Sequence, residues 1–151
     1  MTVTIFIAFT LVAVTFVFHY RVLLWLSLVA QKLTINTSTQ VLMIVLVLFL
    51  AHLVEIGVYA LAYAGSVSVL GLGEFQGSQV NDPMSFLYYS GVIYTTLGLG
   101  DIQPAGHIRF LTATEALNGF LLITWSASFT FLAMGHLWPW TNQAVARPSR
   151  Q

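Results

Sequence analysis

Residues 95–101 read TTLGLGD, a polar segment punctuated by glycine in a chain that has little polar sequence elsewhere. Gly98 and Gly100 stand at alternate positions, and glycine adopts the positive φ angles that other residues resist. Such a segment can turn its backbone carbonyls toward one side, where they can replace the water around a cation. The stretch predicts a cation-binding loop between two apolar segments.

The composition around this loop is that of a membrane protein. Of the 151 residues, 58% are hydrophobic and 7% are charged, which lies far outside the usual make-up of soluble domains. The formal net charge is zero and the five basic residues are scattered, so nucleic-acid binding is excluded. The chain has no cysteine, and its four histidines are too dispersed for a zinc motif. We expect no cofactor besides permeant ions.

Three apolar runs are long enough to cross a membrane, which takes ~20 helical residues for ~30 Å of hydrocarbon. The first helix is assigned to residues 1–31 and is expected to be retained, because no basic segment precedes its apolar run as in a signal peptide. The two later helices are assigned to residues 40–64 and 107–138.

A fourth, shorter helix is predicted at residues 83–95. Asp82 is a favourable N-cap, and Pro83 suits the first helical position. The helix is too short to span, and its partly negative C-terminal end would point at the loop and favour a cation there. Irregular backbone at membrane depth must line a water-filled pore, so a re-entrant helix and loop are expected.

Residues 70–74, LGLGE, almost repeat residues 97–101, LGLGD. The first copy lies in the glycine- and serine-rich segment 65–82, which is typical of an exposed connection. No Thr-Thr pair precedes it and no helix is aimed at it. We therefore interpret the first copy as a coincidence and the second as the ion-binding loop.

TTLGLGD resembles the TTVGYGD signature of the potassium-channel pore domain. The resemblance extends over about residues 41–138, and the chain is also similar to small prokaryotic ion channel proteins with one extra N-terminal helix. It implies an all-α membrane protein with three transmembrane helices, a re-entrant pore helix and a selectivity-filter loop. Because four such loops enclose one pore, it also implies a homotetramer.

The resemblance divides the chain into an extra N-terminal helix, a pore domain and a short cytoplasmic tail. The pore domain, residues 38–138, would contain an outer helix (40–64), an outer loop (65–82), a pore helix (83–95), a filter (96–101) and an inner helix (107–138), with the tail at 139–151. Lys32, Arg147 and Arg150 would share one side, which is cytoplasmic by the positive-inside rule. We expect a multi-pass protein of the cell membrane whose filter faces outside.

The same resemblance implies the site residues. The filter would bind K⁺ and comprise Thr95, Thr96, Leu97, Gly98, Leu99, Gly100 and Asp101. Its ligands would be the carbonyls of residues 96–99 and the Thr96 hydroxyl. Tyr88 and Tyr89 fall at the paired aromatic positions that support the filter, and Val92 stands where some members have a buried glutamate. The implied partners are membrane lipids, monovalent cations and other copies of the chain.

Residues of the inner helix are implied to line the pore. Gly119 matches the glycine at which that helix bends on opening, although a glycine there also allows close helix packing. The spacing after it would turn Phe120, Ile123, Ala127 and Phe131 toward the pore. Phe120 and Phe131 would either gate the pore by dewetting or serve in packing.

The two departures from the signature are Leu97 and Leu99. Leu99 lacks the aromatic hydroxyl that, in the common pattern, holds the filter at its width. A more deformable filter discriminates less well between ions of different radius. We therefore expect potassium conduction with weakened exclusion of sodium, the alternative being a non-selective Na⁺/K⁺ channel.

Ionisable residues inside the predicted spans are costly and mark candidate functional sites. His52, Glu55 and Glu115 are of this kind. Either carboxylate would contact the pore helix and make conduction sensitive to protonation, or it would form a structural bond to a hydroxyl such as that of Tyr94. His19, alone in the first helix, is expected to hydrogen-bond a neighbouring helix.

Two rivals to a passive channel stay open at this stage: a non-conducting subunit, and a transporter or intramembrane enzyme. A non-conducting subunit of a larger complex would not need a filter behind a capped re-entrant helix. A transporter would need more helices and internal repeats. An enzyme would need a nucleophile beside the ionisable residues, so we expect no catalytic activity.

Overall fold

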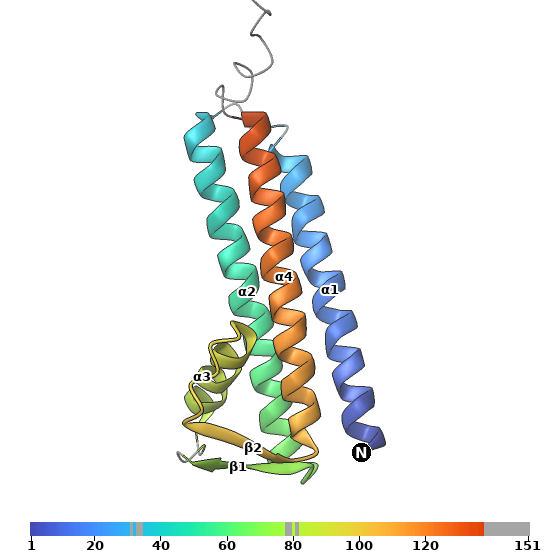
Figure 1. The fold of residues 1–151 in the computed structure, drawn as a ribbon. Coiled ribbons are helices and arrows are strands. Elements are labelled where there is room, and N and C mark those ends of the chain that lie inside the picture. The colour runs from blue at the N-terminus through green and yellow to red at the C-terminus, as the bar shows by residue number, and fades with distance from the viewer. Residues whose placement is uncertain (31, 33–34, 78–79, 81, 138–151) are drawn as a thin grey trace, which may run out of the picture.

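The computed structural model describes residues 1–137 except 31, 33–34, 78–79 and 81. Three long helices run side by side: α1 (Thr2–Ala30), α2 (Thr37–Ser68) and α4 (Ile108–Leu137) (Figure 1). All three are long and apolar enough to cross a membrane, which confirms the predicted spans. The proposed tail, residues 139–151, and Trp138 lie outside the described residues.

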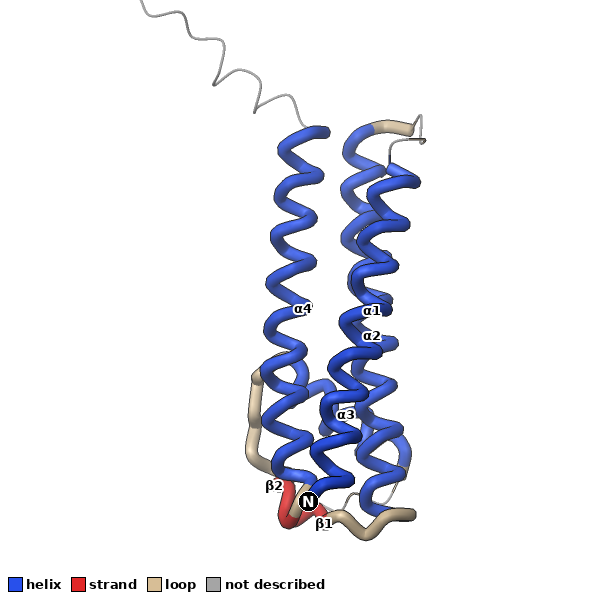
Figure 2. Tube along the Cα trace, turned by 90° about the vertical axis from the view of Figure 1, so that its right-hand side faces the viewer, coloured by secondary structure: helices blue, strands red, loops and turns tan. Residues whose placement is uncertain are grey.

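The short helix α3 (Pro83–Tyr94) lies at one end of this bundle and does not cross it (Figure 2). Asp82 caps it, because its Oδ1 accepts the Ser85 backbone N–H at 2.7 Å and the Ser85 hydroxyl at 3.1 Å. These bonds hold the pKa of the exposed Asp82 carboxyl below its usual value. The cap fixes where the helix starts, and Thr95 ends it where the filter segment begins.

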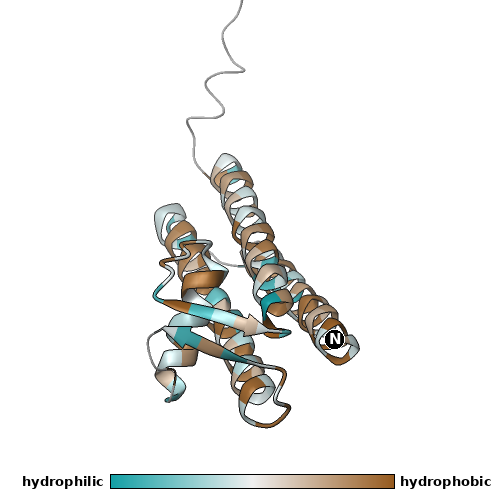
Figure 3. Cartoon of the chain, turned by 60° about the horizontal axis from the view of Figure 1, so that its bottom comes forward, coloured by the Kyte–Doolittle hydropathy of each residue, from teal (hydrophilic) through white to brown (hydrophobic). Residues whose placement is uncertain are grey.

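An antiparallel ribbon closes the end of the bundle where the N-terminus also lies (Figure 1). It consists of β1 (Gly73–Gly77) and β2 (Ile102–Gly106), with Gly73 opposite Gly106. The segment 65–82 is thus more than an exposed connection, since α2 continues to Ser68 and β1 follows. The first Leu-Gly-Leu-Gly copy leads into β1, whose partner β2 directly follows the second copy. The ribbon crosses the end of the helices in Figure 3.

Aromatic rings attach this ribbon to the helices. Phe75 of β1 packs edge-on against Tyr89 of α3 at 4.5 Å between ring centroids and against Tyr63 of α2 at 5.8 Å. Tyr63 and Tyr89 also pack edge-on, at 5.0 Å. The cluster holds α3 at a fixed position beside α2.

α1 packs against the pore domain through polar as well as apolar residues. Thr4, Thr15 and His19 are buried although they lie in an apolar helix. Asn118 of α4 donates to the Thr15 hydroxyl at 2.8 Å and to Tyr59 of α2 at 3.1 Å. Because lipid offers no partner to such groups, these bonds orient α1 toward α2 and α4.

Candidate ion pathway and its buried polar network

The filter segment folds back directly from the end of α3. The amides of Leu97 and Gly98 both donate to the Val92 carbonyl, at 3.0 and 3.3 Å, and the Thr96 amide donates to Ile93 at 2.9 Å. The helix thus shares its last carbonyls with the segment that follows. This bonding fixes the direction in which residues 96–101 leave the helix.

The backbone of the segment alternates in handedness. Thr96, Gly98 and Gly100 have φ angles of 59°, 57° and 79°, whereas Leu97 and Leu99 between them are not in the positive region. Alternation of this kind turns successive N–H groups toward one side of the chain. Thr96 is the only non-glycine residue in the described part of the chain with a positive φ. The sign of φ therefore changes at each residue from Thr96 to Gly100.

Tyr88 connects the pore helix to the outer end of this segment. Its hydroxyl donates to Oδ2 of Asp101 at 2.9 Å, and the neighbouring carboxylate raises the pKa of the exposed Tyr88 hydroxyl. Both residues also line a cavity of about 270 Å³ behind the segment, together with Tyr89, Val92 and Gly98. Hydrogen bonds from Tyr88 to Asp101 and from Gln103 to the Gly100 carbonyl thus hold this end of the segment.

Tyr89 has a different role from Tyr88. Its ring is buried, and its hydroxyl bonds with Thr112 of α4 at 2.9 Å. Adjacent tyrosines therefore attach α3 in two directions, one to the filter and one to α4. The sequence suggested one shared supporting role for the two tyrosines, whereas in the structure their hydroxyls bond to different partners.

Gly119 lies against the end of the pore helix. A Cβ at this position would stand 2.2 Å from the carbonyl oxygen of Tyr94, and α4 runs through Gly119 as one continuous helix from Ile108 to Leu137. Of the two interpretations of this glycine, close packing is the one that these contacts support.

The four residues of α4 that are expected to line the pore are all exposed in the single chain. Phe120 is 54% exposed, Ile123 37% and Phe131 68%, and Ala127 is exposed as well. None of the four belongs to the buried clusters of the described residues. They form a surface of α4 that further copies of the chain can use.

Glu115 joins three helices. Its carboxylate accepts hydrogen bonds from Tyr63 of α2 at 2.6 Å and from Ser90 of α3 at 2.5 Å. Ser90 is also 2.9 Å from the Ile56 carbonyl of α2. Within the described residues Glu115 is in no ion pair, so hydroxyl groups alone satisfy it.

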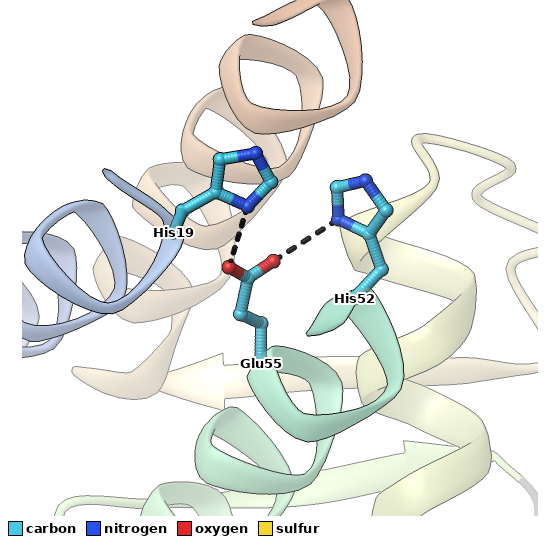
Figure 4. A group of neighbouring side chains, drawn as sticks. All are labelled: His19, His52 and Glu55. Carbon is cyan, nitrogen blue, oxygen red and sulfur yellow. Dashed lines mark hydrogen bonds and ion pairs between the residues drawn. The ribbon is translucent and has the colours of Figure 1, made fainter. Parts of the chain in front are cut away.

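Glu55 is the centre of a second network, which includes α1. His19 and His52 each direct Nδ1 at a different oxygen of its carboxylate, at 2.9 and 3.0 Å (Figure 4). Tyr94, the last residue of α3, donates to the same carboxylate. Glu55 and His19 are fully buried. Both membrane carboxylates thus contact the pore helix, Glu55 at its final residue and Glu115 at Ser90.

The sequence pointed to His52, Glu55 and Glu115 but did not pair His19 with them. His19 and Glu55 are 36 residues apart and lie on different helices. One signal in the sequence could have indicated this pairing: an ionisable residue in a membrane span requires a partner at a similar depth on another helix. At ~1.5 Å per residue, His19 lies ~26 Å from the start of α1 and Glu55 ~20 Å from the end of α2, on the same side of the bundle.

The comparisons with known proteins gave one family match. The family model described as "Ion channel" matches residues 42–135, which extend from near the start of α2 through α3 and the segment after it to near the end of α4. The match leaves out α1. The searches of curated proteins and of solved structures gave no match. Because the matched residues make up more than half of the chain, this multi-pass membrane protein belongs to the ion channel family.

Proposed function

We propose that this protein is a homotetrameric channel that conducts potassium passively through residues 96–101. The observation that supports it most directly is the alternating backbone at Thr96, Gly98 and Gly100. This backbone can present four levels of carbonyl oxygen, from residues 96–99, in place of the hydration shell of a cation. The Thr96 hydroxyl would add a ligand at the inner end.

Four copies are part of the proposal because one segment offers ligands from one side only. In the single chain the filter residues are exposed, with Leu97 at 63% and Leu99 at 57%. Cyclic symmetry would enclose a path between four such segments and would cover the exposed surface of α4 at Phe120 and Phe131. Lipid would contact the outer faces of the helices.

The proposed selectivity is a preference for potassium with weakened exclusion of sodium. Tyr88 and Asp101 supply one hydrogen bond to the outer end of the filter. Leu99, nearer its middle, has no polar atom with which to reach the pore helix. A filter without a side-chain hydrogen bond from position 99 to the pore helix would vary more in width, and its discrimination between ion radii would fall accordingly.

Orientation is proposed from charge. Lys32 follows α1 in the sequence, and α1 ends on the side of the bundle opposite the ribbon (Figure 1), which would be the cytoplasmic side by the positive-inside rule. The filter and the N-terminus would then face the outside of the cell membrane.

Reversal potentials of the purified protein in planar bilayers, with potassium on one side and sodium on the other, test the proposal. We expect a permeability ratio that favours potassium, and a ratio that rises in Leu99→Tyr. Leu97→Ile, which adds no polar group, serves as the control and should leave the ratio unchanged.

A ratio near one would contradict potassium preference. An unaltered ratio in Leu99→Tyr would remove the argument from the missing hydroxyl. A folded tetramer that passes no current would instead support a non-conducting subunit.

A further inference from the structure

The network around Glu55 contains the donor atoms of a metal site. His19, His52 and Glu55 each offer one ligand atom, and these atoms all lie within 4.8 Å of one another. The two contacts from Nδ1 to carboxylate oxygen, 2.9 and 3.0 Å, are near the ~3.3 Å that separates ligand atoms around tetrahedral zinc. Two histidines and one glutamate form a known zinc donor set with an open fourth position.

A fourth oxygen stands beside these three ligands. The Tyr94 hydroxyl lies 2.9 Å from Nδ1 of His52 and is hydrogen-bonded to Glu55. Tyr94 is also the last residue of α3, and the C-terminal end of a helix carries partial negative charge that favours a cation. The four ligand atoms and the C-terminal end of α3 thus both favour a bound cation.

The outer nitrogens of the two rings give the strongest argument. Nε2 of His19 and Nε2 of His52 both lie at Ser126 Oγ, at 3.1 and 3.0 Å. If both Nδ1 atoms donate to Glu55, two neutral rings present two acceptors to one hydroxyl, which has a single proton to give. The hydrogen bonds then cannot all be made at once. If His52 Nδ1 instead accepts the single Tyr94 proton, Ser126 is satisfied but Oε2 of Glu55 loses both His52 and Tyr94 as donors.

A metal on the Nδ1 atoms removes this conflict. Each Nδ1 then binds through its lone pair, each Nε2 carries the proton, and the Ser126 oxygen accepts both N–H groups with its two lone pairs. Metal-bound histidines normally donate their other N–H to an oxygen in this way, which fixes the tautomer and the ring direction. Ser126 is positioned for that role.

The rings are also held in place before any ion binds. His19 stacks on His52 with 5.2 Å between centroids and 29° between planes. Trp125 of α4 packs on His19 at 5.8 Å. Glu55 and His19 are buried, while the His52 side chain keeps 16% exposure, so access to the site is from the His52 side.

We propose that His19, His52 and Glu55 bind one divalent transition-metal ion of the zinc class, with Tyr94 as the fourth neighbour and Ser126 as the shared acceptor. The sequence did not indicate this metal site, because its ligands come from two helices, His19 from α1 and the other two from α2. A bound ion would link α1 to the residue that precedes the filter.

The test is metal content and cobalt spectroscopy on the purified full chain. After treatment with a chelator and desalting, the protein is titrated with Zn²⁺, and bound zinc is counted by mass spectrometry. We expect about one ion per chain, a higher thermal midpoint with Zn²⁺, and the visible bands of tetrahedral Co²⁺ on replacement. His19→Gln and Glu55→Gln should lose all three signals.

Two further variants make the result specific. His107→Gln changes an exposed histidine at the ribbon end and should bind zinc like the wild type. Ser126→Ala keeps every ligand but removes the shared acceptor, and should weaken zinc binding by ~10–100-fold. It also keeps the test valid if His19→Gln does not fold.

The proposal is overturned if the folded wild type binds no Zn²⁺. An extra proton on one of the two histidines would then satisfy the hydrogen bonds at Ser126 without a metal. Equal binding by the wild type and both Gln variants would overturn it as well. Metal content is measured without any current, so the result does not depend on the proposed conduction.

Discussion

Gly119 and Tyr94 meet so closely that a Cβ at position 119 would lie 2.2 Å from the Tyr94 carbonyl oxygen. α4 therefore supports α3 at its last residue. Since the group in the way is backbone, a side chain at 119 cannot be accommodated by a rotamer change. One of the two helices must move.

Gly119→Ala is expected to lower the free energy of unfolding by ~1–3 kcal/mol through overpacking. Denaturant unfolding of the purified protein in micelles measures this. Gly135→Ala in the same helix is the control, because a Cβ there meets no atom of the described residues within 4 Å beyond its own stretch of helix, and it should gain up to ~1 kcal/mol from helix propensity. Equal stability of the wild type and Gly119→Ala would show that the helices are not in contact at this point.

Tyr88→Phe removes the hydrogen bond to Asp101 without changing the ring. We expect lower thermal stability and a potassium-to-sodium permeability ratio closer to one. The pKa of Tyr88 is raised from 10.0 by Asp101, so the bond contributes fully below pH 10 and is lost as the pH rises through the folded-state value. The difference in thermal midpoint between wild type and Tyr88→Phe should be constant from pH 7 to pH 10 and shrink above. A constant difference at all pH values would assign the effect to packing.

Asp82→Ala should lower thermal stability by leaving the first amides of α3 without an acceptor. The pKa of Asp82 is below its usual 3.8, so its charged form stabilises the fold above that pH, and the contribution is lost as the pH falls through the folded-state value. Asp82→Asn, which also caps helices well, should keep most of the stability near neutral pH. Thermal scans between pH 3 and pH 7 distinguish the variants, and an unaffected Asp82→Ala would contradict a role for this cap.

Glu115→Leu removes the carboxylate that accepts hydrogen bonds from Tyr63 and Ser90. Ser90 retains the Ile56 carbonyl at 2.9 Å, whereas Tyr63 retains only the longer contact to Thr112 at 3.4 Å. A buried hydroxyl that loses its partner costs ~1–3 kcal/mol, so a loss of unfolding free energy of that size is expected in denaturant titrations. Glu115→Gln keeps an oxygen acceptor and should be milder. If Gln is as damaging as Leu, the charge of Glu115 matters more than its hydrogen bonds.

The current of Glu115→Gln at different external pH values separates the two roles considered for this residue. The hydroxyl contacts of Glu115 are those of a structural residue, so we expect the wild type and Glu115→Gln to respond to pH alike. A response present only in the wild type would identify Glu115 as the sensor.

Much of the fold was predictable from local sequence. Hydropathy located the three spanning helices, and Asp82-Pro83 located the start of α3, because both signals depend on neighbouring residues alone. The bounds differ by only a few residues, as where α2 runs from Thr37 to Ser68 instead of 40–64. Helix ends are set by caps and tertiary contacts, which hydropathy does not register.

The parts that were missed depend on contacts between distant segments. β1 was taken for a loop because its strand character comes from pairing with β2 and not from an apolar pattern of its own. His19 and Ser126 are 107 residues apart, and nothing in either helix indicates the other. The sequence identified which polar residues needed partners, and only the packing of α1 against α4 determined which partners they have.

The buried polar residues of α1 have a consequence for how the protein is made. α1 is synthesised first and carries Thr15 and His19 into the bilayer before their partners exist, since Glu55 follows 36 residues after His19 and Asn118 follows 103 residues after Thr15. Until α2 and α4 arrive, these groups have no protein partner on another helix, and of the two only Thr15 has a bond within α1, to the Leu11 carbonyl at 2.9 Å. Biogenesis should therefore keep α1 close to its insertion site until the last helix is released, and truncation after α2 should leave a membrane intermediate that quality control removes.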